Sequence, residues 1–135
     1  MRTIYKTYKF RIFPNKTQEV LLNKTFGCTR FVFNHMLAER KETYEKLKDN
    51  KVALKAYKYQ TEKQYKQEFE WLSEVDSIAV QQARVDLETA YKNFFDSISG
   101  KRKGRKVSYP KFKSKRETRQ SFRTINVNNN IDIVF

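Results

Sequence analysis

Basic and aromatic side chains near the C-terminus have the clearest potential chemistry in this sequence. Residues 101–123 contain eleven Lys or Arg against one acid, a local charge of +10, whereas the other 112 residues contribute only +4 to the total of +14. Tyr109, Phe112 and Phe122 are interleaved with these cations. Cationic groups bind phosphates, aromatic rings stack on unpaired bases, and hydroxyls and amides bond to base edges. The stretch therefore predicts a polyanionic partner, either DNA or RNA.

The cations of this stretch are the predicted contacts to the nucleic-acid backbone. A single surface lysine is usually only solvated, so the prediction depends on the cluster and not on any one member. If eight phosphates were neutralised, the binding constant would fall steeply with salt, with a log–log slope of about −7 on B-DNA. The members are Lys101, Arg102, Lys103, Arg105, Lys106, Lys111, Lys113, Lys115, Arg116, Arg119 and Arg123.

Groups suited to catalysis are scarce. His35 is the only histidine and Cys28 the only cysteine, which excludes a His-x-His metal pair, an internal disulfide and a cysteine-rich zinc site. The acids lie among Lys and Arg on expected helices, and Asp76 and Asp86 are ten residues apart and do not share a helix face. Three glycines are too few for a phosphate-binding loop. We therefore expect no catalytic residue, no metal, no cofactor and no small-molecule substrate.

Length and composition indicate one ordinary domain. A chain of 135 residues with 39% hydrophobic content can bury a core. No apolar run approaches the roughly 20 residues needed to cross a bilayer. The first residues, MRTIYKTYKF, lack the apolar region of a signal peptide. We expect a cytoplasmic protein with no membrane partner.

The stretch 71–95, WLSEVDSIAVQQARVDLETAYKNFF, is expected to form the central helix. Apolar residues recur at steps of three and four from Val75 to Ile98, the period of one helix face. Ser73 begins a capping-box pattern, and Gly100 is a natural stop. The long apolar face predicts that other elements pack on this helix.

Two helices are expected before it. Asn15 and Gln18 form a capping-box pattern at the start of a short helix that should end near Gly27. A longer helix should follow over 28–48, and the pair resembles a helix-turn-helix. A third, less regular helix is expected within 51–70.

Extended segments are expected at both ends of the chain. Residues 3–13 alternate apolar and basic side chains, the pattern of a half-buried strand. Further strands are expected over 107–113, 121–127 and 131–135. The predicted fold is α+β and mainly α, with about four helices inserted in a small partial β-barrel or sheet formed by the terminal strands.

Several stretches together resemble the N-terminal part of the TnpB (OrfB) proteins of insertion sequences. They are YKFRIFPNKTQEVLLNKTFGCTRFVFNHMLAER at 8–40, the stretch 71–95, and VSYPKFKSKR and SFRTINVNNN at 107–116 and 121–130. The resemblance covers nearly the whole chain in the family's order. It implies RNA-guided DNA endonucleases encoded beside a separate transposase, with a helical recognition lobe inserted in a β-barrel wedge domain.

The resemblance implies the binding half of such a nuclease without the cutting half. The family's nuclease domain and its zinc-binding element lie downstream of the matching region, and this chain ends at Phe135. The expected partition is a first wedge strand at 1–14, a helical recognition lobe at 15–100 and a basic, truncated wedge part at 101–135. The expected partners are DNA and guide RNA, and no enzyme activity is expected from this chain alone.

Individual contacts to target-flanking DNA are carried over from the resemblance. A glutamine side chain can bond bidentately to an adenine edge, although a solvated helix amide is the plainer interpretation of Gln81. The residues at matching positions are Tyr57, Tyr59, Ser77, Ile78, Gln81, Val127 and Asn128.

Two other functions remain open at this stage. One is an intact nuclease or transposase, which would need carboxylates that this sequence does not visibly bring together. The other is a sequence-specific DNA-binding regulator or a transposase remnant. Retention of a specific duplex in the absence of RNA would favour the regulator.

Overall fold

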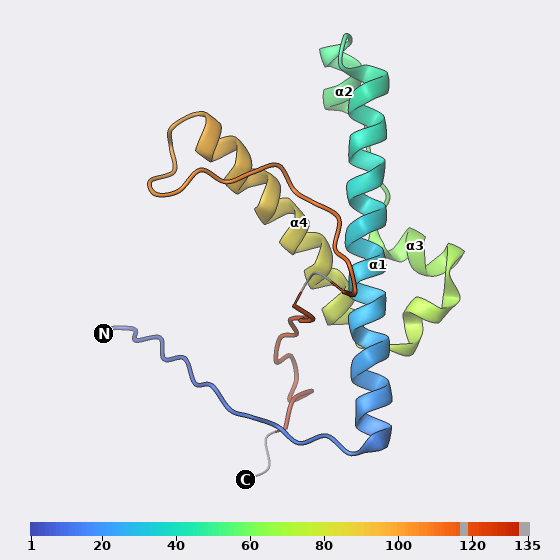
Figure 1. Cartoon of the computed structure of the whole chain (residues 1–135), viewed down its shortest axis with the longest axis vertical. Coiled ribbons are helices and arrows are strands. Elements are labelled where there is room, and N and C mark those ends of the chain that lie inside the picture. The colour runs from blue at the N-terminus through green and yellow to red at the C-terminus, as the bar shows by residue number, and fades with distance from the viewer. Residues whose placement is uncertain (117–118, 133–135) are drawn as a thin grey trace.

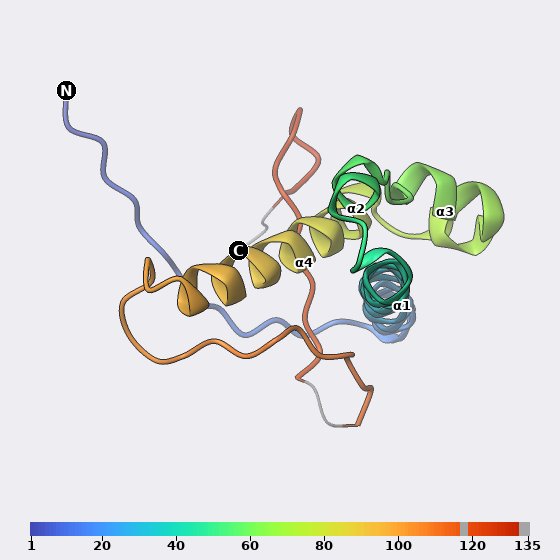
Figure 2. The ribbon, with the colours of Figure 1, turned by 90° about the horizontal axis from the view of Figure 1, so that it is seen from above.

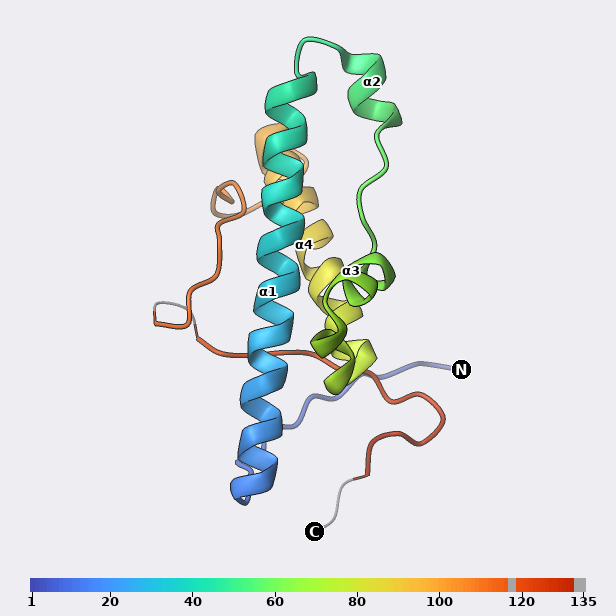
Figure 3. The same cartoon turned by 90° about the vertical axis from the view of Figure 1, so that its right-hand side faces the viewer.

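The structure is a computed structural model that describes residues 1–116 and 119–132. Its elements are α1 (Lys16–Leu47), α2 (Lys51–Ala56), α3 (Glu62–Glu68), the 3₁₀-helix η1 (Glu70–Glu74) and α4 (Ser77–Ile98). The long helix α1 is the axis of the molecule (Figure 1). Helices α2 and α3 lie along one side of α1, and the segment that follows α4 passes on the other side (Figure 3).

Helix α1 begins at the predicted cap but does not break at Gly27. The Asn15 side chain accepts from the Gln18 amide at 2.9 Å, and the Gln18 side chain accepts from the Asn15 amide at 2.9 Å. The helix then runs for 32 residues, so the two helices expected on either side of Gly27 are one. Buried residues on both sides of Gly27, including Thr25 and Cys28, contribute to packing that offsets the low helix propensity of glycine.

The predicted β-structure is wrong. Residues 1–116 and 119–132 contain no strand, so the described chain has no sheet, no partial β-barrel and no pairing of the N-terminal segment with the C-terminal ones. The last expected strand, 131–135, lies partly outside the described residues. In the N-terminal segment Tyr8, Phe10 and Ile12 are 70%, 63% and 70% exposed. Alternation predicts an extended backbone with one apolar face, but a strand also needs a neighbouring backbone to bond to.

The core lies between α1 and α4. The largest fully buried side chains are Val32 and Leu37 from α1, Val80 and Leu87 from α4, and Leu72 from η1. These residues belong to one cluster of buried apolar side chains. The predicted apolar face of the central helix is therefore confirmed along its first half.

The second half of α4 is different. Phe95 and Ile98 are 59% and 68% exposed, although the periodicity placed Ile98 on the buried face. Figures 1 and 2 show the reason, because α4 crosses α1 near the start of α4 and diverges from it toward the C-terminal end. A regular apolar stripe predicts a face but not how much of it a partner covers.

Helix α4 starts later than expected. Residues 70–74 form η1, and the cap of α4 is Asp76, whose carboxylate accepts from the Ile78 amide at 3.1 Å. The predicted stop is confirmed, since Gly100 follows the C-cap with a φ of 77°, a conformation that favours glycine. The third helix expected within 51–70 is two short ones, α2 and α3.

A carboxylate on α1 fixes α3 and the preceding loop. Glu39 accepts from the Tyr65 hydroxyl at 3.0 Å, the Gln60 amide at 3.1 Å and the Tyr57 hydroxyl at 3.4 Å. Burial, together with the bond to Glu39, raises the pKa of Tyr65 well above its ordinary value, so its hydroxyl stays protonated and donates. Arg84 of α4 pairs with Glu62 of α3 at 2.9 Å, so an ion pair also links α3 to α4.

The molecule is open. Its accessible surface is 11662 Å², against about 7,500 Å² for a compact monomer of 16.3 kDa. The excess comes with the long segments that flank the helices (Figure 1). No helix in the described part of the chain combines the length and apolar content that crossing a bilayer requires.

Continuity of α1 through Gly27 can be tested by replacing that glycine with alanine. A Cβ at Gly27 would have one neighbour within 4 Å, the Arg30 side chain at 3.9 Å, which is an ordinary contact. Gly27→Ala should therefore raise the free energy of unfolding by about 0.5–1 kcal/mol, measured by urea denaturation followed by circular dichroism. Gly100→Ala is the matched control and should lower it by about 1 kcal/mol, because Gly100 has a positive φ. Destabilisation by Gly27→Ala would indicate a turn at this position.

Candidate nucleic-acid interface

The basic segment, residues 101–123, folds back from the end of α4 toward α1. After Gly100 the Arg102 amide donates to the Asp96 carbonyl at 3.1 Å, and the Val107 amide donates to the Ser97 hydroxyl at 3.0 Å. The chain then runs alongside α4 and reaches α1 (Figures 1 and 2). The charge that the sequence concentrates in one stretch is thereby spread across both core helices.

One side chain of α1 clamps the backbone of this segment. Asn34 donates to the Lys113 carbonyl at 2.9 Å and accepts from the Lys113 amide at 2.8 Å. An amide side chain that bonds both groups of one residue replaces the backbone neighbour that a strand would have had. Nearby, the Tyr91 and Tyr109 hydroxyls lie 2.7 Å apart.

Aromatic residues of the segment pack against cations of α1. The Lys41 ammonium lies 4.5 Å from the centre of the Phe112 ring and 5.5 Å from that of Tyr109. Conversely, the Lys113 ammonium lies 4.4 Å from the Phe33 ring of α1. These cation–π contacts are part of what orders the segment. The rings that the sequence offered for base stacking therefore have partners within the chain.

Two carboxylates of α4 hold the end of the segment. Arg123 pairs with Asp86 at 2.7 Å. The Thr124 hydroxyl donates to the Asp76 carboxylate, which also caps α4. These contacts give Asp76 and Asp86 structural partners and hold Arg123 and Thr124 against the first half of α4.

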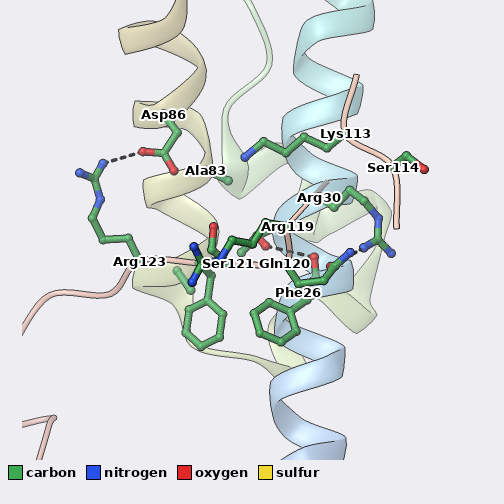
Figure 4. Close-up of a pocket in the computed structure, with 13 residues that line it drawn as sticks. Phe26, Arg30, Ala83, Asp86, Lys113, Ser114, Arg119, Gln120, Ser121 and Arg123 are labelled. Carbon is green, nitrogen blue, oxygen red and sulfur yellow. Dashed lines mark hydrogen bonds and ion pairs between the residues drawn. The ribbon is translucent and has the colours of Figure 1, made fainter. Parts of the chain in front are cut away.

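A pocket opens where α1, α4 and the basic segment meet (Figure 4). Arg30 of α1 lies at one side of it and donates to the Gln120 side chain at 3.0 Å, while the rings of Phe26 and Phe122 pack at 5.4 Å. Among the described residues, one carboxylate, Asp86, lines this pocket together with four cations, Arg30, Lys113, Arg119 and Arg123.

Sequence reasoning missed Arg30. It lies more than 70 residues before the basic stretch, on a helix with interleaved charges, and nothing in its local pattern distinguishes it from a solvated arginine. Asn34 and Phe26, one helical turn to either side of Arg30 on α1, contact Lys113 and Phe122 and so bring Arg30 to the basic segment.

The residues proposed to contact flanking DNA form two groups. Ser77 and Gln81 are exposed on the first turns of α4, and Ile78 is half-buried there. Val127 and Asn128 are exposed in a turn that Asn130 closes by accepting from the Val127 amide and donating to the Ile125 carbonyl. The bond between Thr124 and Asp76 places these two groups on neighbouring elements.

Tyr57 and Tyr59 are placed against a different part of the molecule. Their rings meet edge to face at 5.1 Å beside Glu39 and Arg40, in the C-terminal half of α1. Tyr57 donates to Glu39, and the Arg40 guanidinium lies 5.1 Å from the Tyr59 ring. Burial raises the pKa of Tyr59. Both rings therefore contribute to packing between α1 and the loop before α3.

His35 and Cys28, the two side chains most suited to catalysis, have contacts that indicate structural roles. His35 stacks on Phe31 at 3.8 Å, with its Nδ1 atom 3.0 Å from the Phe31 carbonyl. Cys28 is buried, and burial raises the pKa of its thiol, so the nucleophilic thiolate is disfavoured. Within residues 1–116 and 119–132, no three His, Cys, Asp or Glu side chains are grouped to hold a metal ion.

Comparison with known proteins identifies the family. Residues 1–49 match a family model described as a helix-turn-helix domain, that of the OrfB proteins of IS605 elements. The chain is 31% identical over 121 residues to a Streptomyces pristinaespiralis protein named "Putative RNA-guided DNA endonuclease", covering 90% of this chain and 28% of that protein. It is 33% identical over 118 residues to "Putative RNA-guided DNA endonuclease InsQ" of Escherichia coli K12, covering 87% and 27%.

A shorter relative is matched over most of its own length. The chain is 35% identical over 114 residues to "Virulence protein VsdF" of Salmonella dublin, covering 79% of this chain and 91% of VsdF. This chain belongs to the TnpB (OrfB) family of insertion-sequence proteins and corresponds to its N-terminal, helix-turn-helix region. It spans 28% and 27% of the two endonuclease-named relatives. In the region matched as a helix-turn-helix, residues 16–47 form one continuous helix.

The Asn34 clamp should control how firmly the basic segment is held. Asn34→Ala removes both bonds to the Lys113 backbone, and at about 0.5–1.5 kcal/mol each their loss should make local opening roughly tenfold more frequent or more. Limited trypsin digestion should then cut faster after Lys111 and Lys113. Asn23→Ala, at an exposed position of the same helix, is the control and should leave the cleavage rate unchanged. Equal rates for the two variants would show that the segment is held by other contacts.

Proposed function

We propose that this chain is the nucleic-acid-binding portion of a TnpB-like protein, contacting guide RNA and target-flanking DNA without cleaving either by itself. The observation that carries the proposal is the fixed position of the basic segment on α1 and α4, through the bonds of Asn34 to Lys113 and of Val107 to Ser97. Cations in a disordered tail would bind any polyanion loosely. Cations held at defined positions on two packed helices can match the spacing of phosphates.

The chain divides into parts with different roles in this proposal. Residues 15–100 form the helical support, and residues 101–135 contribute most of the positive charge. The exposed lysines and arginines of the basic segment contact phosphates and set affinity. The first turns of α4 and the turn at residues 127–130 face the DNA beside the target and contribute selectivity.

Support for the selective contacts comes from their placement. Gln81 has an exposed amide on a rigid helix, and the Asp76 cap that bonds Thr124 connects the start of α4 to the segment bearing Asn128. A helix-borne glutamine can bond bidentately to one edge of an adenine, whereas Val127 offers only apolar contact. Tyr57 and Tyr59 are weaker candidates because their rings already pack against Glu39 and Arg40.

The main competing function is nuclease activity of this chain itself. It is suggested by the names of two relatives, of which this chain covers less than a third. Two-metal cleavage needs several carboxylates around ions about 4 Å apart. Here Asp76 and Asp86 bond to Thr124 and Arg123. Metal-dependent cleavage by the 135-residue protein, abolished by replacing one of its own acids, would overturn the non-catalytic proposal.

The nature of the bound nucleic acid can be determined by sequencing what co-purifies with the protein at moderate salt. We expect one discrete, structured RNA, because a guide must be recognised by shape as well as charge. Recovery of random RNA would reduce the proposal to general polyanion affinity. Retention of a specific duplex without RNA would favour a DNA-binding regulator instead.

Selectivity and affinity should separate between two substitutions. With the co-purified RNA bound, Gln81→Ala should reduce discrimination among duplexes with randomised flanking sequence by about 1–3 kcal/mol at one position, because it removes a base-edge contact. Lys111→Ala should weaken binding to all sequences and lower the magnitude of the salt slope by about 1. Both quantities come from binding titrations at several salt concentrations. If Gln81→Ala left flanking preference unchanged, the proposed contact of Gln81 would be wrong.

A further inference from the structure

We propose that the pocket between α1, α4 and the basic segment holds one phosphodiester of the bound nucleic acid, and that Asp86 is an internal counter-ion which this phosphate displaces from Arg123. The inference rests on the proposed function and adds two residues to it, Arg30 and Asp86. Neither was among the contacts expected from the sequence.

Cations from two distant parts of the chain line this pocket, with Arg30 and Arg123 at opposite sides of it. Arg30 comes from α1, while Lys113, Arg119 and Arg123 come from the basic segment (Figure 4). Counted over the described residues, the lining has one carboxylate, Asp86, and a side-chain charge of +3. An excess of this kind on a partly enclosed surface favours an anion, and a guanidinium can bond two phosphate oxygens at once.

A second hollow shows that several lining cations are not enough. The hollow beside α3 is lined by Arg40, Lys63 and Arg84, but also by Glu62 and Glu88. Arg84 pairs with both of these acids at 2.9 Å. The charge of this hollow is therefore nearly balanced, and the hollow has no comparable excess of positive charge with which to hold a phosphate.

The cations of the first pocket are available to a ligand to different degrees. Arg30 bonds the neutral Gln120 side chain, so its charge is not neutralised. Arg119 forms no ion pair within the described residues. Lys113 packs over the Phe33 ring, which leaves its charge intact. Arg123 is the exception, because its guanidinium is paired with Asp86.

The pair of Arg123 and Asp86 is suited to exchange. Its side chains are 55% and 40% exposed, and ion pairs with this exposure contribute little to stability. Asp86 therefore acts as a carboxylate stand-in for phosphate in the free protein. When a phosphodiester enters, Arg123 can turn to it at little cost, while the remaining Asp86 charge opposes binding. The affinity of the pocket for anions is therefore lower than it would be with the cations alone.

Two substitutions of opposite sign test this inference. Arg30→Gln should weaken binding of a single-stranded oligonucleotide several-fold and lower the magnitude of the salt slope by about 0.7, the value for one phosphate contact. Asp86→Asn should strengthen binding several-fold, because it removes the competing carboxylate and frees Arg123. Gln120→Ala is the control, since it breaks the bond to Arg30 without changing charge and should leave the slope unchanged. Circular dichroism and thermal unfolding of each variant establish that it is folded.

The outcomes separate this inference from the proposed function. If the wild-type protein bound no oligonucleotide, the proposed function would fail, and the inference with it. If the wild type bound with a steep salt slope that Arg30→Gln left unchanged, the pocket would not hold a phosphate and the proposed function would stand. If Asp86→Asn bound more weakly than the wild type while remaining folded, Asp86 would be a positioning group for Arg123 and not a competitor.

Discussion

The packing of α1 against α4 is the contact on which the other features of this protein depend. Val32 and Leu37 on one helix and Val80 and Leu87 on the other are almost fully buried, and they fix the two axes relative to each other. Asn34, Asp76 and Asp86 lie on these same helices and bond the segment that follows α4. A chain with so open a surface has few other constraints on its cationic residues. Loss of the helix pair would therefore remove the arrangement of the positive charge as well as the core.

Local chemistry could be predicted from the sequence where it depends on neighbours in the chain. The Asn15 cap, the stop at Gly100 and the apolar face from Ala79 to Leu87 are such features. The strands could not be predicted, because alternation at residues 8–12 describes one face of an extended chain and does not supply the backbone it would pair with. The helix end expected near Gly27 was wrong because it, too, was inferred from local sequence alone. The helix propensity of glycine is low, but packing on both sides of Gly27 decides the outcome.

The candidate site was predictable only where it depends on residues close together in the chain. A run of eleven cations is visible in sequence, and so is its preference for a polyanion. Arg30 and the pairing of Arg123 with Asp86 depend on contacts between residues far apart in the chain. The aromatic rings of the segment were expected to stack on bases. Instead, Lys41 packs over Phe112 and Lys113 over Phe33, so cations and rings of the same chain form cation–π contacts with each other. The interface is thus made by tertiary contacts that bring a local charge cluster onto a helical support.

Photo-cross-linking is the most direct measurement of the central claim, that nucleic acid lies across the basic segment and the adjoining faces of α1 and α4. A single-stranded oligonucleotide carrying photoreactive bases would be bound, irradiated and mapped on the protein by mass spectrometry. The account predicts cross-links within residues 101–128, near Arg30 on α1 and on the first turns of α4. Cross-links centred on α3 and η1, residues 62–74, or spread evenly along the chain would contradict it.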